Sequence, residues 1–377
     1  MARYFVTGAT GFLGAWAARE LAARGHSLRV LVRPESRLEA LAGVPAEVVA
    51  GDVTDRRAVE RAVAGCDAVL HSAGVARLRA NDLRRLMEVN RGGTVLVLTA
   101  ALRAGVRRAV AVSSVGAMGG TLGPVAPDEG WTAAAESSGV DYFVSKLEGE
   151  RAALAIGRLG LPVVVVRPGV VLGPGDVYHS STGTVLRMAK GILPACFRGG
   201  ASFCDVRDVA RGQVEALERG RPGEVYHLGG HNVEMAELAR RVWRLTGVPP
   251  PAHVPYELMF AAVGVREAWN AVAGRPTPVS RQLLRGARRY TWLSSEKAVR
   301  ELGYRVRSLE ETLRDTLGWF LAHGDLEPRT AKLRRLAEGW AREEAVRAGG
   351  RPPRVVAGGR PADAPRAAAA EPVAQEG

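Results

Sequence analysis

Near its amino terminus the chain reads Tyr4-Phe5-Val6-Thr7-Gly8-Ala9-Thr10-Gly11-Phe12-Leu13-Gly14. The apolar run predicts a buried strand, the three glycines predict a tight turn, and the alanine-rich residues that follow predict a helix. Glycine is needed in such a turn because a Cβ would keep a pyrophosphate away from the backbone. The start of the helix offers free N–H groups and the positive end of the helix dipole. The unit therefore predicts a dinucleotide site, with Gly-x-x-Gly-x-x-Gly in place of the commoner Gly-x-Gly-x-x-Gly.

Strands and helices alternate through the following residues. Apolar runs predict strands at 28–32, 48–50, 68–71, 107–113 and 163–167, and helical patterns lie between them at 12–24, 55–64, 80–104 and 142–159. Thr54 is the expected N-cap of the helix at 55–64. Continuous apolar strands between amphipathic helices predict an α/β fold, a Rossmann-type doubly wound parallel sheet with both faces covered.

Composition excludes several classes of protein. The 377 residues are 47% hydrophobic, which excludes global disorder, and the formal net charge is +13. The arginines are scattered without a recognition motif, so we expect no nucleic-acid partner, and attraction of a phosphorylated cofactor is a sufficient use of the charge. No run of about 20 apolar residues and no signal peptide are visible, which predicts no membrane span and a cytoplasmic location.

The three cysteines are Cys66, Cys196 and Cys204. Their number is odd and their spacing fits neither a disulfide framework nor a metal site. We therefore expect three reduced thiols and no bound metal.

Tyr142 and Lys146 lie four residues apart on a predicted helix, so both side chains project from one face. A phenol has a pKa of about 10, and a neighbouring ammonium favours the phenolate and lowers that pKa. Ser113 and Ser114 stand at the end of the strand predicted at 107–113, at the sheet edge that faces a cofactor in such folds. A serine hydroxyl there can hydrogen-bond a substrate oxygen, so these residues predict an acid–base site.

Together these motifs resemble those of the extended short-chain dehydrogenase/reductases, in the NAD-dependent epimerase/dehydratase superfamily. Thr7 to Gly14 resembles the cofactor fingerprint of that family, and Gly51-Asp52-Val53 resembles its adenine-contacting turn. Further matches are His71-Ser72-Ala73-Gly74, Val89-Asn90-Arg91-Gly92-Gly93-Thr94, Tyr142-x-x-x-Lys146, Arg167-Pro168-Gly169-Val170-Val171 and Asp205-Val206-Arg207-Asp208-Val209-Ala210. The resemblance covers residues 1–322, and Gly74 departs from it because alanine is usual there.

The resemblance implies hydride transfer between a nicotinamide and a substrate carbon. It makes Ser114, Tyr142 and Lys146 the catalytic residues: Ser114 orients the substrate oxygen, Tyr142 transfers the proton, and Lys146 lowers the tyrosine pKa and holds the ribose. The implied cofactor-binding residues are Thr7, Gly8, Thr10, Gly11, Phe12, Leu13, Gly14, Arg33, Arg37, Asp52, Val53, Ser72, Ala73, Gly74, Ser113, Tyr142, Lys146, Pro168, Gly169 and Val171.

The cofactor is expected to be NADP(H) in preference to NAD(H). Enzymes that use NAD place an acidic residue after the second strand, to bind the ribose hydroxyls. Here Arg33 stands at that position and Arg37 is nearby. A guanidinium matches a 2′-phosphate in charge and geometry, although Arg33 could instead stack on the adenine.

The motifs allow two hypotheses for an enzymatic function, and a third hypothesis is a sensor that binds NADP without catalysis. The first is a reductase of a small or apolar carbonyl or hydroxyl substrate, similar to dihydroflavonol-reductase-like and 3β-hydroxysteroid-dehydrogenase-like members. The second is a nucleotide-sugar epimerase or dehydratase. Relatives of the second kind usually carry an arginine just before the phenylalanine of the late motif, and Ser202 stands there in this chain. We therefore favour the reductase.

The expected organisation has two parts. Residues 1–172 form an NAD(P)-binding Rossmann domain, to which 203–228 return, while 173–202 and 229–325 form a smaller C-terminal substrate lobe. Residues 326–348 predict a charged surface helix, and 349–377 predict a disordered tail because Gly, Pro, Ala and Arg dominate. The helices at 80–104 and 142–159 could pair with those of a second copy in a homodimer, as in relatives.

The stretch from Tyr256 to Ala273 has a helical pattern and carries several large apolar residues. They are Leu258, Met259, Phe260, Val263 and Trp269. We favour a packed lid helix, and the alternative is contact with a membrane surface or an apolar substrate.

Overall fold

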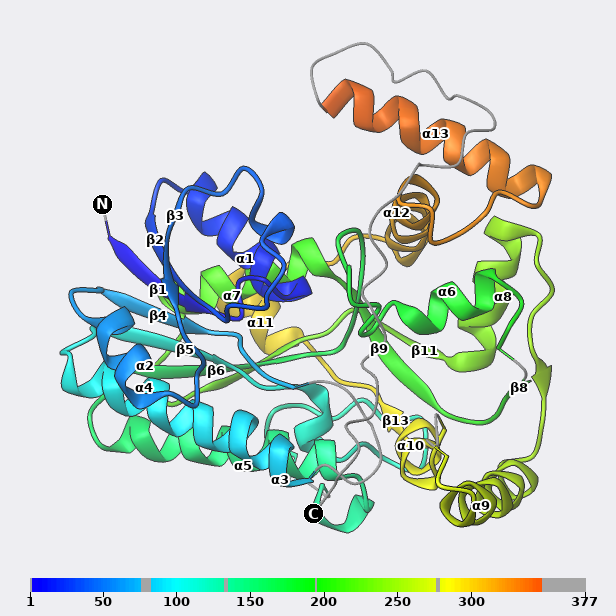
Figure 1. Cartoon of the computed structure of the whole chain (residues 1–377), viewed down its shortest axis with the longest axis horizontal. Coiled ribbons are helices and arrows are strands. Elements are labelled where there is room, and N and C mark those ends of the chain that lie inside the picture. The colour runs from blue at the N-terminus through cyan, green and yellow to red at the C-terminus, as the bar shows by residue number, and fades with distance from the viewer. Residues whose placement is uncertain (1, 76–82, 132–134, 194, 276–278, 348–377) are drawn as a thin grey trace, which may run out of the picture.

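A seven-stranded parallel sheet forms the first part of the molecule (Figure 1). The computed structural model describes residues 2–75, 83–131, 135–193, 195–275 and 279–347. The strands are β1 (Arg3–Thr7), β2 (Ser27–Val32), β3 (Ala46–Ala50), β4 (Ala68–His71), β5 (Arg108–Val112), β6 (Val163–Pro168) and β10 (Val225–Leu228). Their order is β10-β6-β5-β4-β1-β2-β3, and every pair is parallel.

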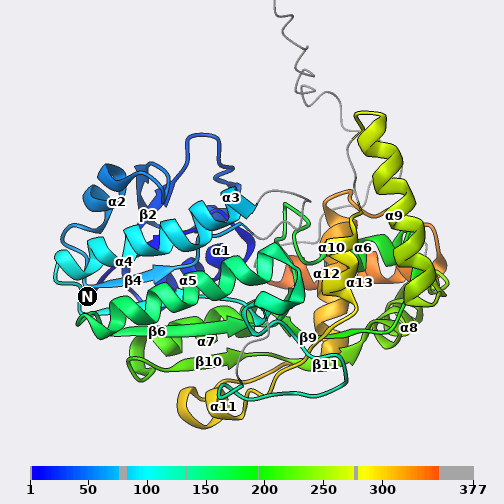
Figure 2. The same cartoon turned by 90° about the horizontal axis from the view of Figure 1, so that it is seen from below.

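Helices cover both faces of this sheet (Figure 2). One face packs on α1 (Phe12–Ala23) and α7 (Val206–Arg219), and the other packs on α2 (Arg56–Val63), α4 (Thr94–Arg103) and α5 (Asp141–Arg158). Within β1, Tyr4 and Val6 enter the first core and Phe5 enters the second, as the alternation of side chains along a strand requires. The doubly wound fold is confirmed, and its strand order reverses between β1 and β4, where such folds bind ligands.

Two helix boundaries differ from expectation. Asp55, and not Thr54, is the N-cap of α2, because its carboxylate accepts the N–H groups of Arg57 and Ala58. The helix expected at 80–104 is α3 (Leu83–Leu86), a π-helical segment (Met87–Gly93) and α4, and residues 80–82 lie outside the described part. A Cβ at Gly93 would lie 2.9 Å from the Val53 side chain, so this segment packs tightly on the loop after β3.

The second lobe is built on a small sheet of β7 (Val170–Leu172), β9 (Gly200–Asp205), β11 (His231–Glu234) and β13 (Tyr290–Thr291). Around it lie α6 (Gly183–Ala189), α8 (Met235–Thr246), α12 (Leu309–Ala322) and α13 (Ala331–Arg347). Its core includes Leu172, Phe203, Leu238 and Phe320. A further pair, β8 (Ala195–Cys196) and β12 (Ala252–His253), is parallel.

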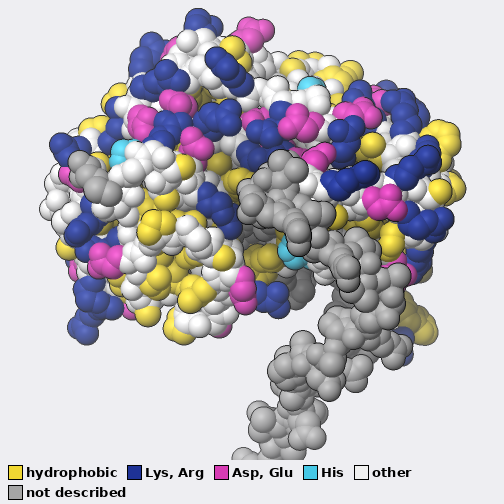
Figure 3. Space-filling model, turned by 90° about the horizontal axis from the view of Figure 1, so that it is seen from above, with side chains coloured by type: hydrophobic (Ala, Val, Ile, Leu, Met, Phe, Trp, Pro, Cys, Tyr) yellow, Lys and Arg dark blue, Asp and Glu magenta, His cyan; other side chains and the backbone are white. Residues whose placement is uncertain are grey.

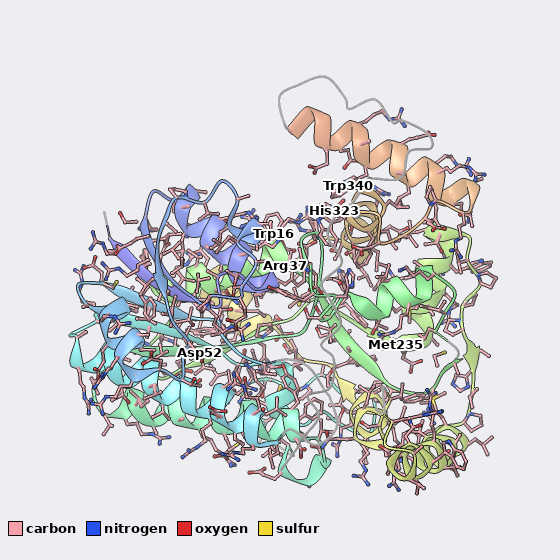
Figure 4. All side chains as sticks on the ribbon, in the orientation of Figure 1. Trp16, Arg37, Asp52, Met235, His323 and Trp340 are labelled. Atoms are coloured by element: carbon pink, nitrogen blue, oxygen red, sulfur yellow. The ribbon has the colours of Figure 1, made fainter. Side chains whose placement is uncertain are left out.

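The chain returns to the first sheet later than the expected residue 203. Residues 203–205 belong to β9 in the second lobe, and the return begins at α7 and continues with β10 beside β6. Helix α11 (Glu296–Leu302) packs on α7 and β10, although we expected 229–325 to lie in the other lobe. Helix α13 buries Leu333 and Trp340, and Trp340 lies between α13 and α12 (Figure 4). The tail expected at 349–377 lies outside the described residues.

Helices α9 (Tyr256–Val272) and α10 (Arg281–Ala287) stand at the outer edge of the second lobe (Figures 1 and 2). Within α9 only Asn270 is buried, while Leu258, Val265 and Trp269 are exposed. The expectation of a packed helix holds for one side only: Met259, Phe260 and Val263 are partly buried and α10 is the main support, while the opposite side is exposed.

Cationic and acidic side chains are interspersed on the face in Figure 3, in keeping with scattered arginines. Within the described residues, no helix is long and apolar enough to cross a membrane. Nor does that part of the chain gather three or more His, Cys, Asp or Glu residues that could hold a metal ion.

Candidate active site

The glycine turn after β1 is formed by close backbone contacts. Gly8 has a φ of +73°, and a Cβ on it would lie 2.7 Å from the Ala73 nitrogen. A Cβ on Gly14 would lie 2.2 Å from the Gly8 oxygen, which also accepts the Gly11 N–H at 2.9 Å. Gly11 is the N-cap of α1 and brings no side chain, so the first N–H groups of α1 have no side-chain cap in the described structure. Such a turn fits a pyrophosphate.

Thr7 supports this turn from inside the protein. Its fully buried Oγ1 lies 2.8 Å from His71 Nδ1 and accepts the Ala73 N–H at 3.2 Å. His71 Nε2 is 3.0 Å from Thr94 Oγ1 on α4. Burial, with a smaller effect of the Lys146 charge, lowers the pKa of His71 to about 3. A neutral His71 therefore joins β1, β4 and α4 just behind the turn.

The other residues expected near the pyrophosphate and the nicotinamide divide by burial. Thr10, Leu13, Ser72 and Ala73 are half-buried, and Gly74 is exposed. Phe12, Pro168 and Val171 are buried, with Phe12 and Val171 in the core on the α1 side of the sheet. Gly169 is needed where β6 leads into β7, because a Cβ there would lie 2.3 Å from the Ser202 oxygen.

The residues expected at the adenosine end surround the ends of β2 and β3. Arg33 directly follows β2 and is exposed, with its Nε 3.3 Å from Glu35 Oε1. Arg37 is also exposed and lies toward the second lobe (Figure 4). Asp52 Oδ1 accepts the Thr54 N–H at 2.9 Å, and Val53 is buried against Gly93.

The structure brings Ser114, Tyr142 and Lys146 together. Ser114 caps a 3-10 helix (Val115–Met118) by accepting the Gly116 N–H at 3.1 Å, and it interacts with the Tyr142 side chain through a hydrogen bond. Tyr142 is in the first turn of α5. One helical turn later, Lys146 Nζ donates to the Val112 carbonyl oxygen at 3.0 Å, at the end of β5.

Burial governs the protonation of this group. It raises the pKa of the Tyr142 phenol, and the hydrogen bond with Ser114 opposes that rise. The expected lowering of the tyrosine pKa by Lys146 is therefore not found here, since desolvation is the larger effect. Burial also lowers the pKa of Lys146 to about 8, opposed by the charge of Glu150. Lys146 is still an ammonium at neutral pH.

Asn90 has a positioning role that we did not predict from the sequence. Its Oδ1 accepts the Val75 N–H at 2.8 Å, and its Nδ2 donates to the Val75 oxygen at 3.1 Å and to Ser145 Oγ at 2.9 Å. It thus fastens the loop after β4 to α5, next to Tyr142 and Lys146. The position of Asn90 in the Val89–Thr94 motif could have marked it as functional, but the motif does not indicate which groups it hydrogen-bonds.

A second group missing from the sequence analysis is a buried polar network behind the site. Glu150 Oε2 accepts hydrogen bonds from Ser113 Oγ at 2.7 Å and Arg167 Nε at 2.9 Å. Arg167 Nη1 also lies 3.2 Å from His227 Nε2, and the backbone N–H of His227 donates to Glu129 Oε1. Ser113 thus faces Glu150 in this structure. The position of Glu150, four residues after Lys146, could have indicated its direction.

The sheet order and the glycine turn define a dinucleotide-binding protein of the Rossmann type. The chain belongs to the NAD dependent epimerase/dehydratase family, whose model matches residues 4–229. Sterol demethylase protein B of Methylococcus capsulatus is 34% identical over 327 residues, which are 85% of this chain and 98% of that protein. A 4-hydroxy-2-methyl-3-oxo-4-farnesyl-3,4-dihydroquinoline-1-oxide ketoreductase of Stigmatella aurantiaca is 31% identical, covering 84% and 95%.

Among solved structures, the UDP-glucose 4-epimerase of Thermus thermophilus in complex with NAD is similar. Its TM-score is 0.67 at 25% identity, covering 84% of this chain and 98% of that one. Together these findings identify the chain as an NAD(P)-dependent oxidoreductase of this family.

Proposed function

We propose that the protein transfers hydride between NADP(H) and an apolar carbonyl or hydroxyl substrate, using Ser114, Tyr142 and Lys146. The observation that carries the proposal is the hydrogen bond between Ser114 and Tyr142 at the end of β5, where Lys146, one turn further along α5, also contacts the strand through the Val112 carbonyl. Gly74, in the loop after β4, supports this placement: a Cβ on it would lie 3.5 Å from Lys146 Nζ. The loop that contacts the turn and the catalytic helix are thus neighbours.

Each side chain has one task in the proposed reaction. When bound, the nicotinamide cofactor supplies or accepts the hydride. Ser114 donates a hydrogen bond to the substrate oxygen, and Tyr142 gives that oxygen a proton or removes one. The Lys146 ammonium favours the phenolate of Tyr142 electrostatically once the proton has left.

Removal of the Tyr142 hydroxyl is the direct test. We expect Tyr142→Phe to lower kcat by at least a hundredfold, which corresponds to about 3 kcal/mol, while the Kd for NADPH stays close to that of the native protein. Tyr256→Phe, on α9, is the control and keeps native kcat. Unchanged turnover in Tyr142→Phe would refute the assigned proton donor.

For the cofactor, the exposed Arg33 and Arg37 support NADP(H). The pair of Arg33 with Glu35 is exposed, so it holds the guanidinium only weakly and leaves it available to a 2′-phosphate. We expect a higher kcat/KM with NADPH than with NADH, and we expect Arg33→Asp to reverse that preference. A clear preference of the native protein for NADH would refute the assignment of NADP(H).

An apolar substrate is supported by two observations. Ser202 is fully buried and its Oγ accepts the Gly230 N–H at 3.0 Å, so this position presents no cation to a sugar diphosphate. The names of two relatives refer to a sterol and to a farnesyl compound. Turnover of apolar ketones and aldehydes with NADPH is expected to exceed turnover of sugar nucleotides.

The second candidate is a nucleotide-sugar epimerase or dehydratase, favoured by the likeness to the UDP-glucose 4-epimerase structure. Conversion of a sugar nucleotide without net consumption of cofactor would select it. Binding of NADPH without turnover of any carbonyl or sugar nucleotide would instead select a sensor.

We also propose a homodimer through α4 and α5, which pack side by side on one face of the sheet (Figure 2). Light scattering after size exclusion measures the mass in solution, and a monomer mass would overturn this. A cytoplasmic location and the lack of a nucleic-acid partner remain predictions from the sequence.

A further inference from the structure

Helix α9 carries an apolar stripe on its exposed side. Leu258, Ala262, Val265, Trp269 and Val272 recur at spacings of three and four, which places them within about 80° of one another around the helix. The exposed fractions are 64% for Leu258, 73% for Val265, 68% for Trp269 and 89% for Val272. Single exposed apolar residues are ordinary, but a continuous line of them marks an interaction surface.

Contacts with α10 hold the helix with this stripe outward. The guanidinium carbons of Arg281 and Arg285 lie 5.8 and 5.7 Å from the centre of the Phe260 ring. Arg281 Nε also donates to Glu267 Oε2 at 2.7 Å. The polar and aromatic side of α9 therefore faces α10, and the stripe on the opposite side is exposed in the described part of the chain.

The surroundings of the stripe are cationic. Residues 256–289 contain six arginines and two glutamates, in a chain with a net charge of +13. Arg266 on α9 and Arg275 just beyond its end are exposed, and Arg285 and Arg288 are exposed on the α10 side, where they stack on Phe260 and Tyr256. Arg266 directly follows Val265, so it flanks the stripe about 100° around the helix. An apolar stripe that contains a tryptophan, is flanked by Arg266 and lies in a cationic region matches the interface of an anionic bilayer.

We propose that α9 docks the protein on the surface of a membrane that contains anionic lipids. The stripe enters the boundary between headgroups and acyl chains, and the arginines remain at the level of the phosphates. With 17 residues and Arg266-Glu267 past its middle, α9 is too short and too polar to span a bilayer, and it lies in the interface plane instead.

A second copy of the chain is the competing occupant of this surface. In a twofold contact the same patch meets itself, so the cationic surroundings of the stripe in two copies would be brought together. Like charges at an interface repel, whereas lipid phosphates neutralise the same charges. The charge distribution therefore favours lipid.

Helix α10, which supports the docking helix, contacts the start of α5. A Cβ on Gly286 of α10 would lie 3.7 Å from the Phe143 ring and from Val140, and Phe143 is next to Tyr142 on α5. Helix α10 thus links the docking helix to the start of α5, and an apolar substrate taken up from the bilayer would reach the site along this side of the protein. This last step rests on the proposed function, whereas docking does not.

Vesicle flotation of the full chain tests the proposal. The vesicles are phosphatidylcholine alone, or equal parts of phosphatidylcholine and phosphatidylglycerol. The variant Val265→Ser/Trp269→Ser/Val272→Ser, called the stripe variant, replaces the three most C-terminal residues of the stripe. The matched control Leu159→Ser/Ile192→Ser/Val299→Ser changes three residues that are 72%, 61% and 52% exposed elsewhere. Sedimentation velocity of each protein without lipid reports self-association.

We expect the native protein and the control to float with anionic vesicles, with weaker binding at high salt. The stripe variant is expected to lose at least about tenfold in partition coefficient, because three side chains no longer enter the interface. Equal binding by the stripe variant would mean diffuse charge attraction and would overturn the proposal. The proposal is also overturned if the native protein does not float with anionic vesicles. It is overturned as well if sedimentation velocity shows that the native protein is an oligomer and that the stripe variant is a smaller species.

Discussion

The glycine turn and helix α9 differ in what determines their residues. In the turn, a Cβ on Gly14 would lie 2.2 Å from the Gly8 oxygen, so the fold itself forbids a side chain. On α9, Val272 is 89% exposed, so packing within the described part of the chain does not require an apolar side chain at this position. The residues of the first region are thus set by internal packing, while those of the second point to something outside the protein. Substitutions can test each side of this contrast.

The largest effect is expected at Gly14. In Gly14→Ala the new methyl group meets backbone, which cannot move aside as a flexible side chain can. We expect a loss of about 4 kcal/mol in the free energy of unfolding and at least a hundredfold weaker NADPH binding, because the turn must open. Urea unfolding and cofactor titration measure the two quantities. Gly339→Ala, where a Cβ meets nothing within 4 Å, is the control and keeps both.

The next effect is expected at the buried pair of Glu150 and Arg167. Glu150→Gln leaves the Arg167 guanidinium without its carboxylate, and we expect a loss of about 3 kcal/mol in urea unfolding. The charge of Glu150 raises the pKa of Lys146, so its removal lowers that pKa further. The alkaline limb of the pH–rate profile should move to lower pH. The exposed-pair control Glu148→Gln should change stability by about 0.5 kcal/mol or less, and an equal loss there would contradict the assignment.

These two sites also show how far the sequence could be interpreted. The alternation of strands and helices and the glycine spacing predicted the doubly wound sheet, because both follow from local periodicity. Tyr142 and Lys146 could be placed on one helix face for the same reason. The contacts of Glu150 could not be predicted, because Ser113 and Arg167 come from separate strands whose pairing depends on the sheet order. Asp55 replaced Thr54 as the N-cap because the Thr54 hydroxyl is used by Asp52.

A smaller loss of stability per residue is expected when the pH is lowered, from two buried histidines. His71 and His227 are buried and neutral, and burial lowers the pKa of each to about 3. Because an unfolded histidine titrates at about 6.5, the unfolded chain binds protons first as the pH falls. The contribution of each neutral histidine to the free energy of unfolding is present in full above pH 6.5 and falls as the pH is lowered toward 3. At pH 5 the free energy of unfolding has decreased by about 2 kcal/mol per histidine.

Urea unfolding at several pH values measures this loss. His71→Gln is expected to flatten the slope between pH 7 and pH 5, while His253→Gln, at an exposed position on β12, keeps it. An unchanged slope in His71→Gln would show that His71 is protonated in the folded protein.

The smallest effect is expected on α9. Val265→Ser/Trp269→Ser/Val272→Ser should change the free energy of unfolding by about 0.5 kcal/mol or less at each site, since these side chains are mostly exposed. Turnover of a small water-soluble ketone should also stay native. A stability loss near that of Glu150→Gln would mean that the stripe is packed within the chain and is not an external surface. The contrast with the glycine turn therefore depends on a stability change close to zero. If replacing these apolar side chains does not destabilise the folded chain, their role is a contact outside it.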